Sequence, residues 1–357
     1  MRGKNTKQSS MLCLMSPEER VPTNHPLRSI KKLADAALEE LSPVFDEMYS
    51  SVGRPSVPPE RLLKAMLLIA LYSVRSERLF CEQLDYNLLF RWFLDMDMLE
   101  SSFDATAFTH NRDRLMEHEV AARFFQAVVD QARRGHLMSA EHFSVDGTLI
   151  EAWASAKSFR PKDDDDDDDN NGWSDFSGKK RSNKTHESKT DPDAKLWRKG
   201  RGREAKLSYM GHALMENRNG LLVDFEVTEA SGYAERDAAI SMLNEALPGE
   251  RRITIGADRG YDTKDFVRRC REHGVTPHVA QNATAHRRSA IDQRTTRHSG
   301  YSISIGIRRR VESIFGWLKT IGGLRRTRVR GLQRTRLLGT MGAAAYNLLR
   351  MSRLLAT

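Results

Sequence analysis

A short apolar stretch that ends in an acidic residue and a glycine is the feature that most constrains the fold of this chain. Phe143, Ser144 and Val145 have the character of a buried β-strand, and Asp146 followed by Gly147 marks the predicted end of that strand. A side chain at such a position leaves the edge of a sheet and can lie in a cleft. Because Asp-Gly is also a common turn signal, this stretch alone predicts only a strand and a turn.

The same pattern of strand, carboxylate and glycine recurs in residues 252–262. Alternating β-branched residues lead into Asp258, Gly260 follows two positions later, and a helical pattern starts at Thr263. A strand with an acidic residue at its end is therefore predicted twice.

A third acidic residue, Glu312, lies on a predicted amphipathic helix. The apolar residues of this segment follow helical spacing: Ile307, Val311, Ile314, Phe315 and Leu318. Glu312 is the only acidic residue after Asp292, and three arginines precede it. It is therefore either the ion-pair partner of these arginines or a metal ligand.

Three carboxylates from two strand ends and one helix are what two-metal phosphoryl transfer requires. Mg²⁺ and Mn²⁺ prefer oxygen ligands and are held by few protein groups. Two such ions, roughly 4 Å apart, activate the attacking oxygen and stabilise the leaving oxygen at phosphorus. Asp146, Asp258 and Glu312 are the candidate ligands of two Mg²⁺ ions, which Mn²⁺ can replace.

Basic residues are concentrated in two segments of the chain. Residues 301–357 contain 12 Arg or Lys and one acidic residue, so their net charge of +11 exceeds the +9 of the whole chain. Residues 178–206 contain 11 basic and four acidic residues, a net charge of +7. Two such segments predict a polyanionic partner, most simply double-stranded DNA, with an affinity that depends on salt.

Cysteine usage and hydropathy bear on the cellular setting. Cys13, Cys81 and Cys270 show neither paired metal-ligand spacing nor a disulfide framework, which is typical of a reducing compartment. The N-terminus has no secretory pattern, and the longest apolar run, residues 65–72, is too short to span a bilayer. We therefore expect a cytoplasmic protein that does not insert into a membrane.

The chain is predicted to divide into a helical part and an α/β part. Residues 1–25 are polar and are expected to be poorly ordered. Residues 26–137 are expected to form an all-helical domain, with helices at about 26–50, 59–75, 77–90, 104–116 and 118–135. Residues 138–357 are expected to form the α/β domain, interrupted by an exposed polar insertion at about 160–195 that contains the aspartate run Asp163 to Asp169.

In combination, these motifs resemble those of the DDE transposases of bacterial insertion sequences, specifically the IS-five-like group. Asp146 lies in a Val-Asp-Gly-Thr motif, and Asp258 lies in a Gly-Ala-Asp-Arg-Gly-Tyr motif. Arg308, Glu312 and Lys319 stand at the family's spacing of Arg, three residues, Glu, six residues, Lys. The resemblance runs from about residue 50 to the end of the chain.

The resemblance implies an RNase H-like catalytic domain with a mixed sheet, in which the strands that carry Asp146 and Asp258 are neighbours. It implies metal-dependent hydrolysis of a phosphodiester at the transposon end, followed by transfer of the freed 3′ hydroxyl to target DNA. The helical domain would bind the terminal inverted repeats or serve only as a scaffold. Pairing of two ends implies a homodimer on DNA, associated with the nucleoid of a bacterium. The basic residues implied to contact DNA are Arg308, Lys319, Arg325, Arg326 and Arg328.

The chain departs from the family's signature at one position. The family carries a tyrosine three residues before the arginine, where this chain has Ile305. Either Tyr301 replaces it from a shifted turn, or a contact with DNA is missing and activity is reduced.

Two other functional classes stay open for this chain: a nuclease of the same fold that cuts DNA without joining it, and a catalytically silent DNA-binding relative. A serine or tyrosine recombinase could use Ser313 or Tyr301, but no other feature supports that mechanism.

Overall fold

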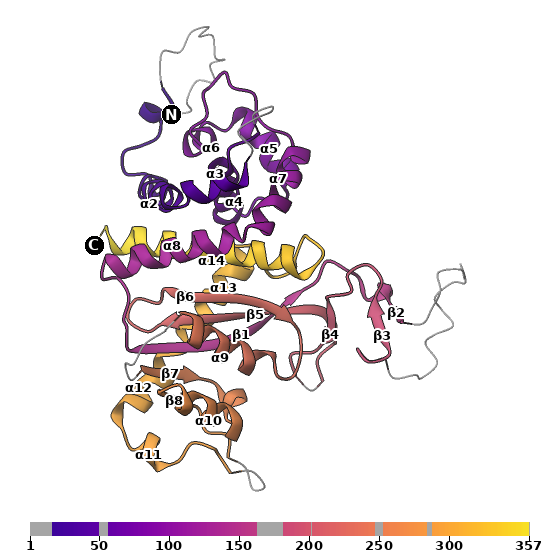
Figure 1. Ribbon diagram of the computed structural model, residues 1–357, viewed down its shortest axis with the longest axis vertical. Helices are drawn as coiled ribbons and strands as arrows, with labels where there is room; N and C mark the ends of the chain where they lie inside the picture. Colours follow the sequence, from indigo (N-terminus) through magenta and orange to yellow (C-terminus); the bar gives the residue numbers. More distant parts are fainter. Residues whose placement is uncertain are drawn as a thin grey trace, which may run out of the picture.

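Helices form the N-terminal part of the chain and lie above the sheet in Figure 1. The structure is a computed structural model that describes residues 16–49, 56–162, 181–200, 202–246, 253–283 and 288–356. The bounds of these helices are α1 (Pro17–Arg20), α2 (Pro26–Glu40), α3 (Ser42–Met48), α4 (Pro59–Leu71), α5 (Glu77–Tyr86), α6 (Leu88–Phe93), α7 (Ala105–Glu117) and α8 (Val120–Arg134). The prediction of an all-helical region before the sheet is confirmed.

Two of the predicted helices are each divided in two. The helix predicted at 26–50 breaks at Leu41, because Pro43 could not donate the hydrogen bond that a continuous helix needs at that position. The helix predicted at 77–90 breaks at Asn87, which ends α5 and caps α6 with its side chain. The short helix after each break adds buried side chains to the same core, including Phe45 of α3 and Phe90 of α6.

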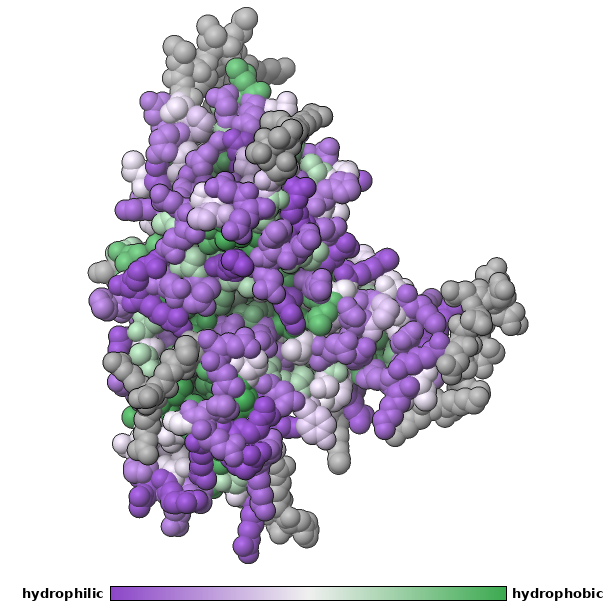
Figure 2. All heavy atoms as spheres, viewed as in Figure 1, coloured by the Kyte–Doolittle hydropathy of each residue, from purple (hydrophilic) through white to green (hydrophobic). Residues whose placement is uncertain are grey.

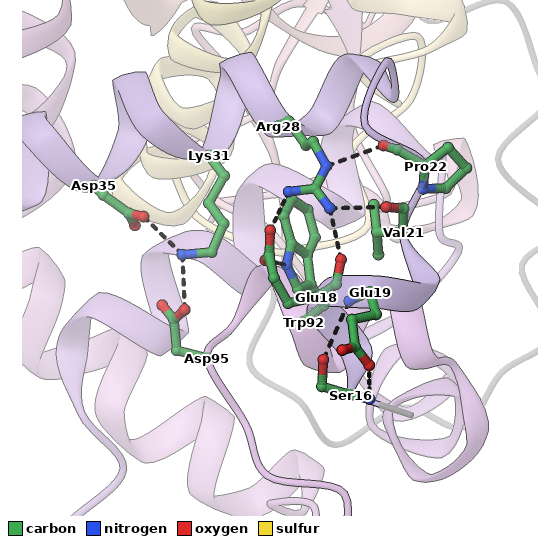
Figure 3. A network of polar contacts seen from close by, with 10 residues as sticks. All are labelled: Ser16, Glu18, Glu19, Val21, Pro22, Arg28, Lys31, Asp35, Trp92 and Asp95. Carbon is green, nitrogen blue, oxygen red and sulfur yellow. Dashed lines mark hydrogen bonds and ion pairs between the residues drawn. The ribbon is translucent and has the colours of Figure 1, made fainter. Parts of the chain in front are cut away.

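The segment before α2 is ordered from Ser16 onward, which corrects the prediction for residues 1–25. The Ser16 hydroxyl accepts a hydrogen bond from the third residue of α1 at 3.2 Å, and that residue's side chain accepts from Ser16 N at 3.0 Å. Glu18 pairs with Arg28 and accepts a hydrogen bond from the Trp92 indole (Figure 3). The capping box is a local signal in the sequence, whereas the contact between Glu18 and Trp92 joins residues far apart in the chain. The part of the segment before Ser16 lies outside the described residues.

A mixed sheet lies at the centre of the molecule. Its order is β6-β5-β1-β7-β8. β4 pairs with the start of β5, on the same side of β5 as β6. The bounds are β1 (His142–Glu151), β4 (Lys195–Trp197), β5 (Lys206–Glu216), β6 (Leu222–Glu229), β7 (Ile253–Ala257) and β8 (Val275–Val279). β5 is antiparallel to β1 and β6, whereas β1, β7 and β8 are parallel. This order confirms the predicted RNase H-like fold and the predicted pairing of the strands next to Asp146 and Asp258.

Helices cover both faces of this sheet. On one face, α9 (Ala234–Ala246) and α10 (Lys264–Glu272) contribute to a core with Phe143 and Val145 of β1. On the other face lie α13 (Arg310–Thr320) and α14 (Leu332–Leu354), whose core includes Ile150 and Phe225. α12 (Ser299–Ile307) packs against β7 and β8. A short helix, α11 (Gln293–Thr296), precedes α12. Alternate side chains along β1 therefore point to opposite faces of the sheet and enter different cores, as the pleat of a strand requires.

The last helix, α14, joins the helical region and the sheet into one core. It lies beside α8, between the N-terminal helices and the sheet (Figure 1). One continuous cluster of buried side chains includes Leu67 of α4, Phe124 of α8, Leu348 of α14 and Phe225 of β6. The boundary predicted at residue 137 therefore separates two segments of chain that share a core.

We expect Asn347→Leu to destabilise this junction by about 2 to 5 kcal/mol, because two buried backbone groups lose their partners. The Asn347 side chain accepts a hydrogen bond from Leu222 N at 2.9 Å and donates one to Leu222 O at 2.8 Å. Urea unfolding measures the change in free energy. The matched control is Ser352→Ala on the same helix, whose hydroxyl bonds only the carbonyl of Leu349. Equal midpoints for the two variants would contradict the prediction.

The predicted insertion at about 160–195 is partly built into the fold. β2 (Phe159–Pro161) and β3 (His186–Ser188) pair in a small antiparallel sheet. β4, at the C-terminal end of the predicted insertion, joins the main sheet. Asp191 is buried and accepts a hydrogen bond from the Tyr209 hydroxyl at 2.6 Å. These contacts correct the prediction of a wholly exposed insertion. The aspartate run lies outside the described residues.

Hydrophilic residues cover most of the face shown in Figure 2. α14 is the longest described helix, with 23 residues, but it carries four arginines. None of the described helices is long and apolar enough to cross a membrane.

Candidate active site

Asp146 lies within β1 and not at its end, which corrects the predicted turn at Gly147. β1 stays paired with β5 as far as Glu151, so the strand runs through the Asp-Gly pair. Its pairing with β7 ends at Ser144. Between Ser144 and Glu151 no described strand pairs with that side of β1, and Asp146 lies at this opening.

Asp258 follows the last residue of β7 and lies level with Asp146. The last partners in the parallel β1–β7 pair are Ser144 and Gly256. Extending this register by two residues places Asp146 and Asp258 side by side. Asp258 also caps the short helix η3 (Arg259–Tyr261), because its Oδ1 accepts a hydrogen bond from Gly260 N at 2.7 Å. This bond fixes the direction of the carboxylate.

Asp146 lies in a largely buried setting in which burial and the neighbouring carboxylate of Asp258 disfavour its charged form. The pKa of Asp146 is raised to about 7, first by burial and then by the carboxylate of Asp258, with a smaller contribution from Glu235; Arg308 opposes the shift. Adjacent carboxylates that repel each other are stabilised by a cation, and their oxygen atoms are the ligands that Mg²⁺ and Mn²⁺ prefer. The chemistry of the donors therefore fits a divalent cation.

Arg308 lies between α12 and α13 and approaches the aspartates from the face of the sheet on which these helices lie. A Cβ atom built on Gly256 would lie 3.4 Å from the Cβ of Arg308. The Nε atom of Arg308 is buried and has no hydrogen-bond partner among the described residues. A buried donor without a partner costs about 1 to 3 kcal/mol, and an anionic oxygen of a ligand would remove that cost.

Glu312 does not join the aspartate pair in this structure. It is exposed in the first turn of α13, after a break between α12 and α13 at Arg308 and Arg309. Within the described ranges, no three His, Cys, Asp or Glu side chains converge closely enough to hold a metal ion. The structure thus brings together two of the three predicted carboxylates, and Glu312 as the third ligand stays a prediction.

Another carboxylate, Glu235, lies beside the aspartates and was not singled out from the sequence. It belongs to the first turn of α9, and a Cβ atom on Gly147 would lie 2.7 Å from its Cγ. The pKa of Glu235 is raised, first by burial and then by Asp258. An acidic residue at a helix start is ordinary, so only the packing against Gly147 distinguishes it.

A basic groove opens beyond the aspartates along β1. Its volume is about 790 Å³, and its lining includes Leu149, Glu151, Trp197, Lys199, Gly200, Arg203, Glu204, Lys206, Ser208 and Arg325. Leu149 is three residues past Asp146, so the groove begins about 10 Å from the aspartates along the strand. Lys319 lies close to it: burial lowers the pKa of Lys319, and Lys199 and Arg325 lower it further.

Two of the other predicted DNA contacts, Arg326 and Arg328, have hydrogen-bond partners inside the chain. Arg326 donates hydrogen bonds to the backbone oxygens of Ala152 and Trp153, and Arg328 donates one to Val74 O at 2.8 Å. Arg325 is exposed and lines the groove. Arg326 and Arg328 therefore hold the segment before α14 in place, and their contact with DNA stays a prediction.

Tyr301, the candidate replacement for the missing family tyrosine, lies between α12 and β8. Its hydroxyl donates a hydrogen bond to Val279 O at 3.0 Å, and its ring packs edge-on against His278 at 5.8 Å. This hydroxyl already has a partner in the protein.

Comparison with known proteins gives two matching families. Residues 15–114 match the family described as "Transposase domain (DUF772)", and residues 139–348 match "Transposase DDE domain". No curated protein matches the chain. One similar solved structure is the synaptic complex of piggyBac transposase with hairpin DNA, at 10% identity and a TM-score of 0.42, covering 92% of this chain and 75% of that one. Another is the Mos1 transposase paired-end complex with the left transposon end, at 11% identity and a TM-score of 0.20, covering 72% and 78%.

The DDE family model spans more than half of the chain, including both aspartates and the segment that holds Arg308, Glu312 and Lys319. The fold, the paired aspartates and this match agree. The chain belongs to the family of transposases with a DDE catalytic domain, and it is a DNA transposase.

Proposed function

We propose that this transposase belongs to the IS-five-like group and moves a bacterial insertion sequence. It binds the terminal inverted repeats of its element, hydrolyses a phosphodiester at each end, and joins the freed 3′ hydroxyl to target DNA. The adjacency of Asp146 and Asp258 at an unpaired side of β1, near the buried Nε atom of Arg308, is the observation that supports this chemistry most directly.

Asp146 and Asp258 would hold Mg²⁺, with Glu312 as the third ligand that the family's signature assigns. When bound, two such ions lower the barrier to in-line displacement by activating the attacking oxygen and stabilising the leaving one. Arg308 offers its unpaired Nε–H to a phosphate oxygen and so orients the scissile phosphate. The Gly260 N–H holds Asp258 in one direction throughout.

The basic groove holds the DNA strand that leaves the aspartates. Lys199, Arg203 and Arg325 place positive charge along it, and Lys319 adds a charge from α13. Such contacts position a duplex without reading its sequence. Sequence recognition therefore falls to another part of the chain, and we assign it to the helical region of residues 26–137.

Two transposon ends must meet in one complex, so the active assembly on DNA is a homodimer. We place it in the bacterial cytoplasm, at the nucleoid when it is bound to DNA. These assignments follow from the reaction that we propose.

The test is a reaction of the purified protein with Mg²⁺, a labelled duplex that carries the element's own terminal repeat, and a target plasmid. Cleavage at the repeat boundary together with joined product supports the proposal. Cleavage without joining identifies a nuclease, and binding without cleavage identifies a silent DNA-binding relative.

We expect Arg325→Ala to weaken DNA binding equally for repeat and unrelated duplexes, because its contact in the groove is with phosphate. The slope of log affinity against log salt should decrease in magnitude by about 1. Fluorescence anisotropy over a range of salt concentrations measures this slope. Arg268→Ala is the control, since Arg268 pairs with Asp265 and Glu272 on the surface of α10. The same slope for both variants would argue against a groove that follows DNA.

A further inference from the structure

Glu235 reaches across the sheet surface to the strand that carries Asp146. The Cβ position of Gly147 lies only 2.7 Å from the Glu235 Cγ and 2.8 Å from its Oε1. Real Cβ atoms do not come this close, so the side chain occupies the space that any residue larger than glycine would fill. Gly147 and Glu235 thus constrain each other, although 88 positions separate them in the sequence.

An ordinary role at the surface of α9 does not account for the position of the Glu235 side chain. A glutamate in the first turn of a helix normally points into solvent and interacts with the helix dipole. The backbone N–H groups before α9 are already served by the Ser231 hydroxyl, which accepts from Tyr233 and Ala234. Glu235 is instead partly buried next to two other acids, Asp146 and Asp258. Such a position is unfavourable without a positive partner.

The hydroxyl of Tyr261 is a second, independent sign that a ligand belongs here. Tyr261 is fully buried, and its hydroxyl has no hydrogen-bond partner among the described residues. It lies within electrostatic range of Glu235, Asp146 and Asp258 together. A buried phenol normally bonds a neighbouring acceptor. None of these three carboxylates accepts a hydrogen bond from the Tyr261 hydroxyl, so this buried donor is left for a bound group.

We propose that Glu235 contributes a third carboxylate to the divalent cation held by Asp146 and Asp258, and that it does so before DNA binds. The carboxylates come from β1, from the end of β7 and from the start of α9. They do not stand at ligand distances from one point in this structure. A rotation of the Glu235 side chain, which has three rotatable bonds, is the movement that binding requires. Glu312, exposed on α13, then joins only when DNA is present.

This inference rests on the proposed metal-dependent function and is tested by metal binding. Free Mn²⁺ is measured by electron paramagnetic resonance during titration of the full chain without DNA. We expect Glu235→Gln to weaken Mn²⁺ binding by about tenfold or more. Gly147→Ala should weaken it as well, because the added methyl displaces Glu235 while leaving its charge. Asp237→Asn should bind like wild type, since it removes a carboxylate from the same helix that pairs with Arg269.

The outcomes separate this inference from the function on which it rests. If Glu235→Gln and Gly147→Ala bind Mn²⁺ like wild type while Asp258→Asn does not, the inference is wrong and the two aspartates remain the site. If Glu312→Gln weakens binding without DNA and Glu235→Gln does not, Glu312 is the third ligand and the inference is again wrong. If the wild type binds no Mn²⁺ and cleaves no repeat DNA, both the inference and the proposed function are wrong. Circular dichroism checks that each variant is folded.

Discussion

Asp258→Asn should lower cleavage of terminal-repeat DNA by roughly 10³-fold or more, as is usual when a central catalytic group is removed. The substitution keeps the Oδ1 atom that accepts a hydrogen bond from Gly260, so η3 should stay capped. It removes the negative charge that raises the pKa of Asp146, and so it relieves repulsion in the folded protein. We therefore expect a melting temperature equal to or above that of the wild type, together with unchanged affinity for repeat DNA. End-cleavage assays, thermal unfolding and anisotropy measure the three quantities.

The control for this substitution is Asp265→Asn, an exposed aspartate in the first turn of α10. It should leave cleavage unchanged. Appreciable cleavage by Asp258→Asn would remove the basis for the proposed catalytic role of the pair. Glu312→Gln in the same assay reports whether the exposed third acid is needed once DNA is bound.

Without a divalent cation, the free energy of unfolding should fall as pH rises from about 4 to about 7. Asp146 has a pKa of about 7 in the folded chain against an ordinary value of 3.8, so the folded state holds a proton that the unfolded state has released. Stability from this group is complete below about pH 4 and is lost above about pH 7. The difference amounts to on the order of 2 to 4 kcal/mol. Urea unfolding in a chelator at several pH values measures it.

Because other groups titrate too, the informative quantity is the difference between the wild type and Asp146→Asn. The Asp146→Asn curve should be flatter over this range. Asp224 is a useful comparison, since burial and then Glu226 raise its pKa to about 7 as well, on β6. Adding Mg²⁺ should change the pH dependence of the wild type and of Asp224→Asn but not that of Asp146→Asn. Parallel curves for the wild type and Asp146→Asn would contradict the assignment.

Much of the fold was predictable because its elements carry local periodicity. The pattern around Asp258 predicted a strand, a cap and a helix, and these form β7, η3 and α10. The strand order then followed from the resemblance, and it was enough to place Asp146 next to Asp258. Errors arose where tertiary contacts overrode a local signal. Asp-Gly at 146 and 147 predicts a turn, but pairing with β5 carries β1 through it.

The sequence by itself determined the acidic residues, the strands that present two of them, and the positive charge that demands a polyanionic partner. These properties depend on residue type and on spacing over a few positions. Tertiary structure alone decided that Glu235 fills the space above Gly147, that the Nε atom of Arg308 is buried with no hydrogen-bond partner among the described residues, and that α14 unites two segments in one core. Each of these depends on packing between residues far apart in the chain, where hydrophobic burial and excluded volume act without a local sequence pattern.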